Sequence, residues 1–105
     1  MRYNKQQPVI QPQKREVSIE EQESLDEINA LNEKGHLILY NDEVNTFEHV
    51  IDTLIEVCGH TQEQAMQCAT ITHNNGKCAV KSGAILVLSN MCVRLLDRKL
   101  NAMVE

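Results

Sequence analysis

Four cysteines and an aspartate–histidine pair are the residues of this 105-residue chain whose types could carry chemistry. The cysteines are Cys58, Cys68, Cys78 and Cys92, and no two of them have the C-x-x-C spacing of a zinc knuckle or a redox dithiol. In a reducing compartment, free cysteines are usually small buried groups. The sequence therefore predicts no metal site and no cofactor.

Asp42 and His73 could act together as a general acid and base. The chain has no nucleophile with a base in a recognisable motif, and its four glycines form no phosphate-binding loop. Each residue also has a structural explanation: Asp42 lies in a turn sequence, and His73 lies near the end of an expected helix, where the dipole stabilises a cation. The sequence favours a protein that is not an enzyme.

Net charge and hydropathy exclude further classes of function. Ten Lys and Arg residues against 15 Asp and Glu residues leave a formal net charge of −5, which disfavours nucleic acid and anionic membrane surfaces. The longest apolar stretch, Ala84 to Leu88, is far shorter than the roughly 18–20 residues of a membrane span. The first residues do not resemble a secretory signal. We expect a cytoplasmic protein of one domain.

Residues 1–35 differ in composition from the rest of the chain. They contain both prolines and few large apolar side chains, so they bury too little surface to offset the entropy of ordering. A short helix could begin at Ser18, but the apolar residues that follow it are sparse. We therefore predict a mostly disordered, flexible extension over residues 1–35 and a folded domain over residues 36–105.

The folded part begins with an apolar run, His36–Tyr40, that predicts a buried strand. Asn45 followed by Glu48 has the form of a capped helix start. The helix is predicted over residues 46–58, because apolar residues recur at helical spacing until Gly59. These apolar residues are Phe47, Val50, Ile51, Leu54 and Cys58.

Four more elements are expected in the second half of the chain. A second helix begins at a capping sequence, Thr61 to Gln64, and ends near His73. A strand over Lys77–Lys81, a third helix that starts at Ser82 and Gly83, and a final strand over Leu100–Val104 follow. The order β-α-α-β-α-β predicts an α+β fold, in which three helices cover one face of a small three-stranded antiparallel sheet.

Two segments resemble the signature of the ClpS family. One is Leu39-Tyr40-Asn41-Asp42-Glu43 directly before the first helix, and the other is Ile71-Thr72-His73 followed by Gly76-Lys77. The resemblance covers the whole folded part, His36 to Val104. ClpS proteins are adaptors of the bacterial N-degron pathway, which bind proteins with a bulky apolar N-terminal residue and deliver them to a Clp unfoldase for proteolysis.

The resemblance implies that Asn41, Asp42 and His73 bind the α-amino group of the substrate. An α-ammonium group has three N–H donors, and an amide oxygen, a carboxylate and an imidazole nitrogen can accept them. Because His73 accepts only when neutral, acid conditions are expected to weaken binding.

The resemblance also implies an apolar pocket for the first side chain of the substrate, which would be Leu, Phe, Tyr or Trp. Its walls would be Asn45, Phe47, Ala69, Thr72 and Leu100. Phe47 stands where many relatives have a methionine that excludes β-branched side chains. Ala69 stands where some relatives have a methionine, so we expect a deeper or wider pocket here. Glu43 replaces a commoner aspartate.

By the same resemblance, Lys81, Ser82 and Met91 would contact a ClpA- or ClpC-type unfoldase, and the flexible extension would engage it during delivery. The alternative is an interaction module shaped like the C-terminal domain of the ribosomal stalk protein. That module would not need Asn41, Asp42 and His73 to converge on one apolar hollow, so their convergence separates the two hypotheses.

Overall fold

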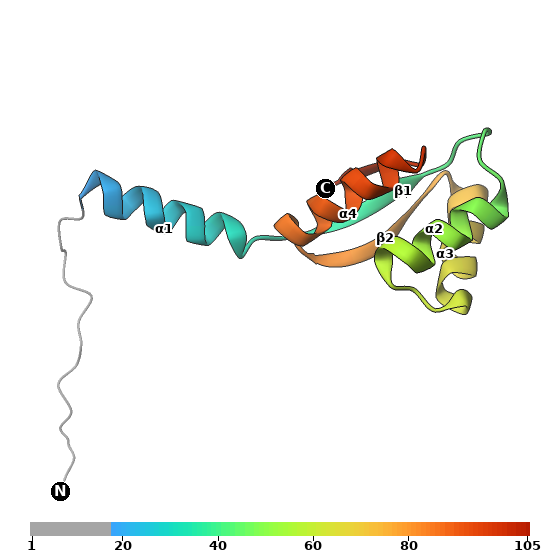
Figure 1. Ribbon diagram of the computed structural model, residues 1–105, viewed down its shortest axis with the longest axis horizontal. Helices are drawn as coiled ribbons and strands as arrows, with labels where there is room; N and C mark the ends of the chain where they lie inside the picture. The colour runs from blue at the N-terminus through green and yellow to red at the C-terminus, as the bar shows by residue number, and fades with distance from the viewer. Residues whose placement is uncertain (1–17) are drawn as a thin grey trace, which may run out of the picture.

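The order of helices and strands from the first strand onwards is the predicted β-α-α-β-α-β (Figure 1). The structure is a computed structural model that describes residues 18–105, so the disorder expected for residues 1–17 lies outside the described residues. The elements are α1 (Ile19–Leu31), β1 (Lys34–Tyr40), α2 (Phe47–Cys58), α3 (Gln62–Asn75), β2 (Lys77–Ala84), α4 (Ile85–Asp97) and β3 (Asn101–Val104).

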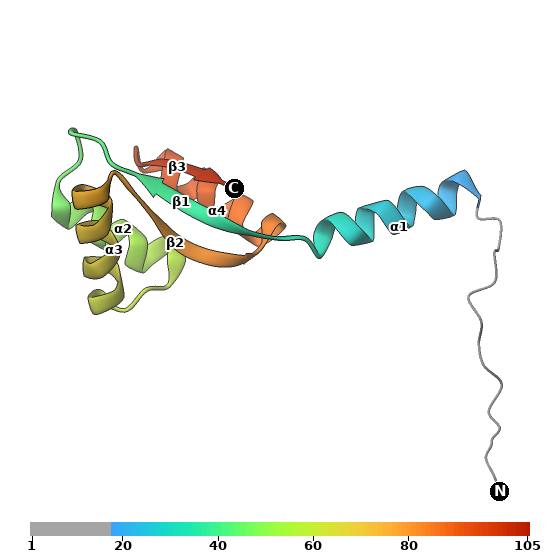
Figure 2. The ribbon, with the colours of Figure 1, turned by 180° about the vertical axis from the view of Figure 1, so that it is seen from behind.

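The three strands form one antiparallel sheet in the order β2-β1-β3, with β1 in the centre (Figure 2). Leu37 and Leu39 alternate along β1 with side chains of the opposite face, and both are fully buried. They form one core with Leu54 of α2, Ala65 of α3 and Leu88 of α4. The fold class predicted from the sequence is therefore confirmed.

The start of α2 differs by one residue from the expected cap. Thr46, not Asn45, is the N-cap, and its side chain accepts a hydrogen bond from the backbone N–H of His49 at 3.1 Å. The side chain of Asn45 is bound instead to Asp42. The helix ends as expected at Gly59, whose φ of 72° is in the left-handed region.

The boundary between β2 and α4 lies three residues later than predicted. Ser82–Ala84 were expected to begin a helix, but they pair with Lys34–His36 in the sheet, and α4 begins at Ile85. These residues are held in the strand because β1 also starts earlier than expected, at Lys34. A register shift between Leu37 and Ile38 makes Val80 an extra residue in β2, and Val80 is buried.

The segment before the sheet contains a 13-residue helix, α1, where the sequence predicted mostly disorder. A reciprocal pair of bonds starts it, because the Ser18 N–H donates to Glu21 Oε1 and the Glu21 N–H donates to Ser18 Oγ, both at 3.1 Å. In both ribbon views α1 projects away from the sheet and the other helices (Figures 1 and 2).

Candidate functional site

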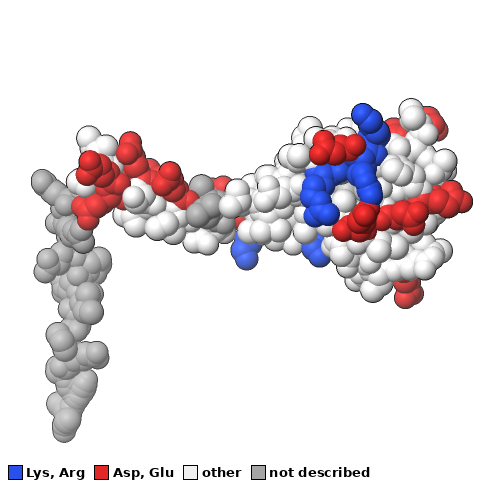
Figure 3. Space-filling model, viewed as in Figure 1, with Lys and Arg blue, Asp and Glu red and all other residues white. Residues whose placement is uncertain are grey.

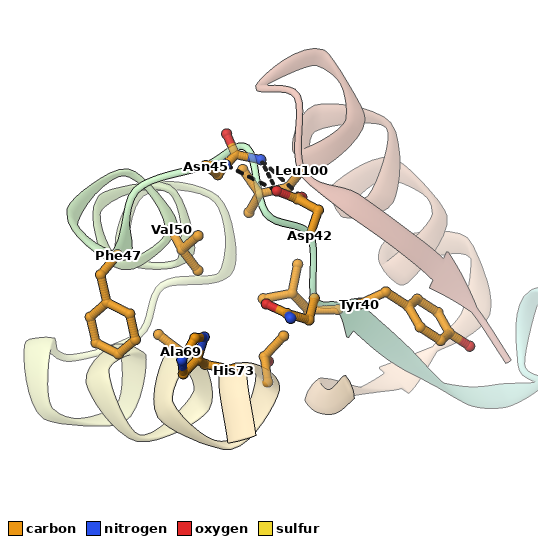
Figure 4. A pocket seen from close by; sticks show the side chains of 11 residues that line it. Tyr40, Asp42, Asn45, Phe47, Val50, Ala69, His73 and Leu100 are labelled. Atoms are coloured by element: carbon orange, nitrogen blue, oxygen red, sulfur yellow. Dashed lines mark hydrogen bonds between the residues drawn. The ribbon is translucent and has the colours of Figure 1, made fainter. Parts of the chain in front are cut away.

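One hollow lies where the loop after β1, the start of α2, the C-terminal half of α3 and Leu100 meet (Figure 4). It contains about 50 Å³ of open space. All eight residues expected to bind an α-amino group or an apolar side chain line it: Asn41, Asp42, Asn45, Phe47, Ala69, Thr72, His73 and Leu100. The fold thus brings together residues from three separate parts of the sequence.

Asp42 is held in a fixed orientation by the residues that follow it. Its Oδ1 accepts the backbone N–H groups of Val44 at 2.9 Å and Asn45 at 3.0 Å. The side-chain amide of Asn45 also donates to both carboxylate oxygens, at 3.2 Å to Oδ1 and 3.0 Å to Oδ2. The carboxylate is therefore oriented before any ligand arrives, and Oδ2 has the fewer protein partners.

The surroundings of Asp42 favour its charged form. Partial burial raises the pKa of this carboxyl, but the backbone hydrogen bonds from Asn45 and Val44, the side-chain bond from Asn45 and the nearby His49 outweigh it. The net result is a pKa below the ordinary value. Asp42 is thus an anion at neutral pH and also under moderately acid conditions, as the partner of a cation must be.

Asn41 and His73 come close because the loop after β1 is tied to the end of α3. The backbone N–H of Asn41 donates to the carbonyl of Gly76 at 2.9 Å, and Gly76 is the left-handed residue that ends α3. The side-chain amide of Asn41 donates to Glu43 at 3.4 Å, so its oxygen remains to accept a ligand donor. His73 is exposed and has no hydrogen-bond partner within residues 18–105.

A second set of bonds connects the site to the loop between α4 and β3. The amide of Asn45 donates to the carbonyl of Lys99 at 2.8 Å, and Nε2 of His49 lies 2.8 Å from the carbonyl of Arg98. Lys99 has a φ of 71°, which reverses the chain before Leu100. These contacts hold Leu100, which is almost fully buried, against the hollow.

The rest of the lining is mostly apolar. Ala69 and Thr72 lie on the face of α3 that meets the hollow, and the Thr72 hydroxyl donates to the Cys68 carbonyl at 2.8 Å, so it needs no other partner. Phe47 opens α2 with its ring directed towards α3, near Ala69 and His73, and it is 42% exposed (Figure 4). The site thus combines charged and polar acceptors with an apolar wall.

Sequence analysis missed three lining residues: Leu39, Tyr40 and Val50. Leu39 and Val50 have the spacing of ordinary core residues, so their types gave no separate signal. Tyr40 directly precedes Asn41, and this adjacency could have indicated its place. Its hydroxyl is turned away from the hollow (Figure 4). The hydroxyl donates to Glu105, and this bond raises the pKa of Tyr40.

The three residues expected to contact an unfoldase have separate surroundings. Nζ of Lys81 donates to the carbonyl of Cys58 at 3.0 Å, at the end of α2. Oγ of Ser82 lies 2.7 Å from Nδ1 of His36. Met91 is half-buried against the core. The contact of these three residues with an unfoldase stays a prediction.

Outside the hollow, the cysteines are the described residues whose types could carry chemistry. All four cysteines are free thiols, and desolvation by burial raises the pKa of Cys58, Cys68 and Cys92. Residues 18–105 contain no group of three His, Cys, Asp or Glu side chains placed to hold a metal ion. Among them there is also no helix of the length and hydropathy that a membrane span requires.

The fold and the hollow define a small α+β binding domain with a fixed carboxylate beside an apolar wall. The chain belongs to the ClpS family: the model of the family described as "ATP-dependent Clp protease adaptor protein ClpS" matches residues 31–102.

A more distant similarity links the chain to a much larger protein. Over 47 residues it is 47% identical to the E3 ubiquitin-protein ligase ubr-1 of Caenorhabditis elegans. The matched segment is 45% of this chain but 2% of the ligase.

Proposed function

We propose that this adaptor binds proteins with Leu, Phe, Tyr or Trp at the N-terminus and delivers them to a Clp unfoldase for degradation. The observation that carries the proposal is that Asn41, Asp42 and His73 line the same hollow as an apolar wall. A ribosomal-stalk-like module would have no use for this convergence. Membership of the ClpS family supports both parts of this proposal, the recognition of N-terminal residues and the delivery to a Clp unfoldase.

The α-amino group of the substrate is the positive charge that the site accepts. Its three N–H donors match the Asp42 carboxylate, the Asn41 side-chain oxygen and a neutral His73 ring nitrogen. Among residues 18–105, only Asn45 donates a bond to Oδ2 of Asp42, which leaves this oxygen capacity for a further donor. An acetylated N-terminus has neither the charge nor the three donors, so it should not bind.

The first side chain of the substrate would be buried between Phe47, Ala69 and Leu100. Burial of a large apolar side chain is worth roughly 1.5–3 kcal/mol, which gives the preference for bulky residues over small or charged ones. The small side chain of Ala69 widens the hollow on the α3 side. Exposed Phe47 can change its position to fit different side chains.

For delivery, we propose a ClpA- or ClpC-type unfoldase as the partner and the cytoplasm as the compartment. Four free cysteines are in keeping with a reducing compartment. The segment similar to ubr-1 fits a role in selecting proteins, because a ubiquitin-protein ligase also acts on proteins.

The test is a fluorescence-anisotropy titration of the full chain with peptides that differ only at their first residue. Leu and Phe peptides should bind, and a Glu peptide and an acetylated Leu peptide should not. Equal binding of the free and acetylated Leu peptides would refute amino-group recognition. Binding of none of the peptides would refute the pocket assignment, while leaving membership of the adaptor family unaffected. An Ile peptide reports whether Phe47 admits a β-branched residue.

A further inference from the structure

The outer face of α4 is an unpartnered apolar surface. Three large aliphatic side chains share one face of this helix and are 47–57% exposed: Leu86, Val93 and Leu96. Leu88 and Leu95 point to the core on the other side of the helix. We call the three exposed residues the α4 stripe. Such a contiguous apolar surface on a small domain indicates a contact with another helix or protein.

The α1 helix also has exposed apolar side chains on one face. Leu25 and Ile28 are three residues apart, so they share one face of α1, and they are 47% and 52% exposed. An isolated helix of 13 residues is at the length, about 12–15 residues, where helices in water are only marginally stable. This helix therefore gains most of its stability if its apolar face packs on something.

The charges of α1 and of the C-terminal end of α4 are opposite in sign. Residues 18–33 contain six acidic side chains (Glu20, Glu21, Glu23, Asp26, Glu27 and Glu33) and no Lys or Arg. The C-terminal half of α4 carries Arg94, which makes no ion pair within residues 18–105. Arg98 follows the helix and is already paired with Glu56 of α2, so Arg94 is the cation of this surface that lacks a partner among these residues. Acidic side chains follow α1, while Lys and Arg gather over the C-terminal end of α4 (Figure 3).

The chain connection brings the two helices end to end. The N–H of Ile85, the first residue of α4, donates to the carbonyl of Glu33 at 2.8 Å, directly after α1. From this point the two helices extend away from each other (Figure 1). Each has 13 residues, or about 20 Å of helix. A reversal at Asn32 and Glu33 would lay α1 antiparallel along α4 over its full length.

We propose that α1 folds back about Asn32 and Glu33 and packs on the α4 stripe of the same molecule. Leu25 and Ile28 then contact the stripe, and the acidic N-terminal half of α1 lies over Arg94 and Arg98. The short connection gives α1 a high effective concentration at this surface, so a modest contact is enough to populate the packed state. A partner that binds the α4 stripe must displace α1.

The test is hydrogen–deuterium exchange of the full chain, read by mass spectrometry at two protein concentrations. If α1 packs on α4, its amides exchange at least about tenfold more slowly than an unstructured chain. The protection should fall in Ile28→Ser and in Val93→Ser, because each removes an apolar contact. Both sites are exposed and Ile, Val and Ser have similar helix propensities, so the domain should stay folded.

The matched control is Ile19→Ser. Ile19 lies nine residues before Ile28, on the opposite side of α1, and is 78% exposed, so this change should leave the protection intact. The proposal is overturned if wild-type α1 exchanges at the unstructured rate, or if Ile19→Ser and Ile28→Ser have equal effects. Protection that survives Val93→Ser overturns α4 as the docking surface. Protection that disappears on dilution means that a second copy, not the same molecule, supplies the contact.

Discussion

The side-chain amide of Asn45 donates to both carboxylate oxygens of Asp42 and, with its other N–H, to the carbonyl of Lys99. One residue thus fixes the anion of the site and ties it to the loop that carries Leu100. Sequence analysis assigned Asn45 to the wall of the pocket. Its hydrogen bonds make it also the residue that positions Asp42.

Asn45→Ala should weaken ligand binding by disordering Asp42, even though no direct polar contact with the α-amino group is removed. The pKa of Asp42 should rise, because one of the groups that lower it is lost. Titration of the Asp42 carboxyl by NMR measures this directly. An unchanged Asp42 pKa in a variant that binds weakly would show that Asn45 acts only as a pocket wall.

The lowered pKa of Asp42 also predicts how the stability of the fold depends on pH. The pKa of Asp42 is lower in the folded chain than in the unfolded chain, so its ionised form stabilises the fold above the unfolded value, about 3.9. This contribution is lost as the pH falls through the folded pKa. The difference in urea midpoint between wild type and Asn45→Ala should therefore be larger at pH 6 than at pH 2.5. A difference independent of pH would contradict this linkage.

Asp42→Asn should abolish detectable binding of an N-terminal Leu peptide, or weaken it by about 100-fold. An uncharged amide leaves the substrate ammonium partly desolvated without its counter-charge. Glu43→Gln is the control, because Glu43 is the neighbouring exposed carboxylate and is not part of the lining. Anisotropy titration of both variants decides the matter, and equal losses would show that only the overall negative charge of the loop matters.

The parts of the fold that follow from local patterns could be predicted from the sequence. The helical spacing of Phe47, Val50 and Leu54 predicted α2, and Gly59 predicted where this helix ends. The end of β2 could not be predicted in this way. Ser82 and Gly83 have the chemistry of a helix start, but pairing with Lys34–His36, far away in the sequence, keeps them in the strand.

The site was predictable only in part for a related reason. The resemblance to the ClpS family suggested all eight expected lining residues, of which only Asn41, Asp42, Thr72 and His73 lie in the two motifs. Leu39 and Val50 were missed because a residue that packs in a core and one that faces a hollow can have the same type and spacing. Asn45 and Thr46 both have side chains that cap helices, so the sequence alone did not separate the cap from the partner of Asp42.

Phe47→Ala should lower the affinity for a Leu peptide by about tenfold while changing the free energy of unfolding by less than about 1 kcal/mol. The ring is 42% exposed in the free chain, so its removal costs little there, but it is covered when a side chain enters the hollow. Val44→Ala is the control, because Val44 is 87% exposed and is not part of the lining. A large loss of stability in Phe47→Ala would show that the ring belongs to the core.

The final prediction compares alanine substitutions of the two glycines that end α2 and α3. Gly59 and Gly76 both have left-handed backbones, with φ of 72° and 93°, and a Cβ at either would meet no atom within 4 Å. Alanine at each position should therefore cost a similar free energy of unfolding, about 1–2 kcal/mol, from backbone strain alone.

Only Gly76→Ala should also weaken peptide binding, because the Gly76 carbonyl accepts the N–H of Asn41 and holds the loop next to His73. Gly59→Ala has the same strain at a position away from the hollow, so it controls for the loss of stability. Urea denaturation and anisotropy titration on both variants give the comparison. Equal effects on affinity would mean that the bond between Gly76 and Asn41 does not position the site, and that stability alone explains any loss of binding.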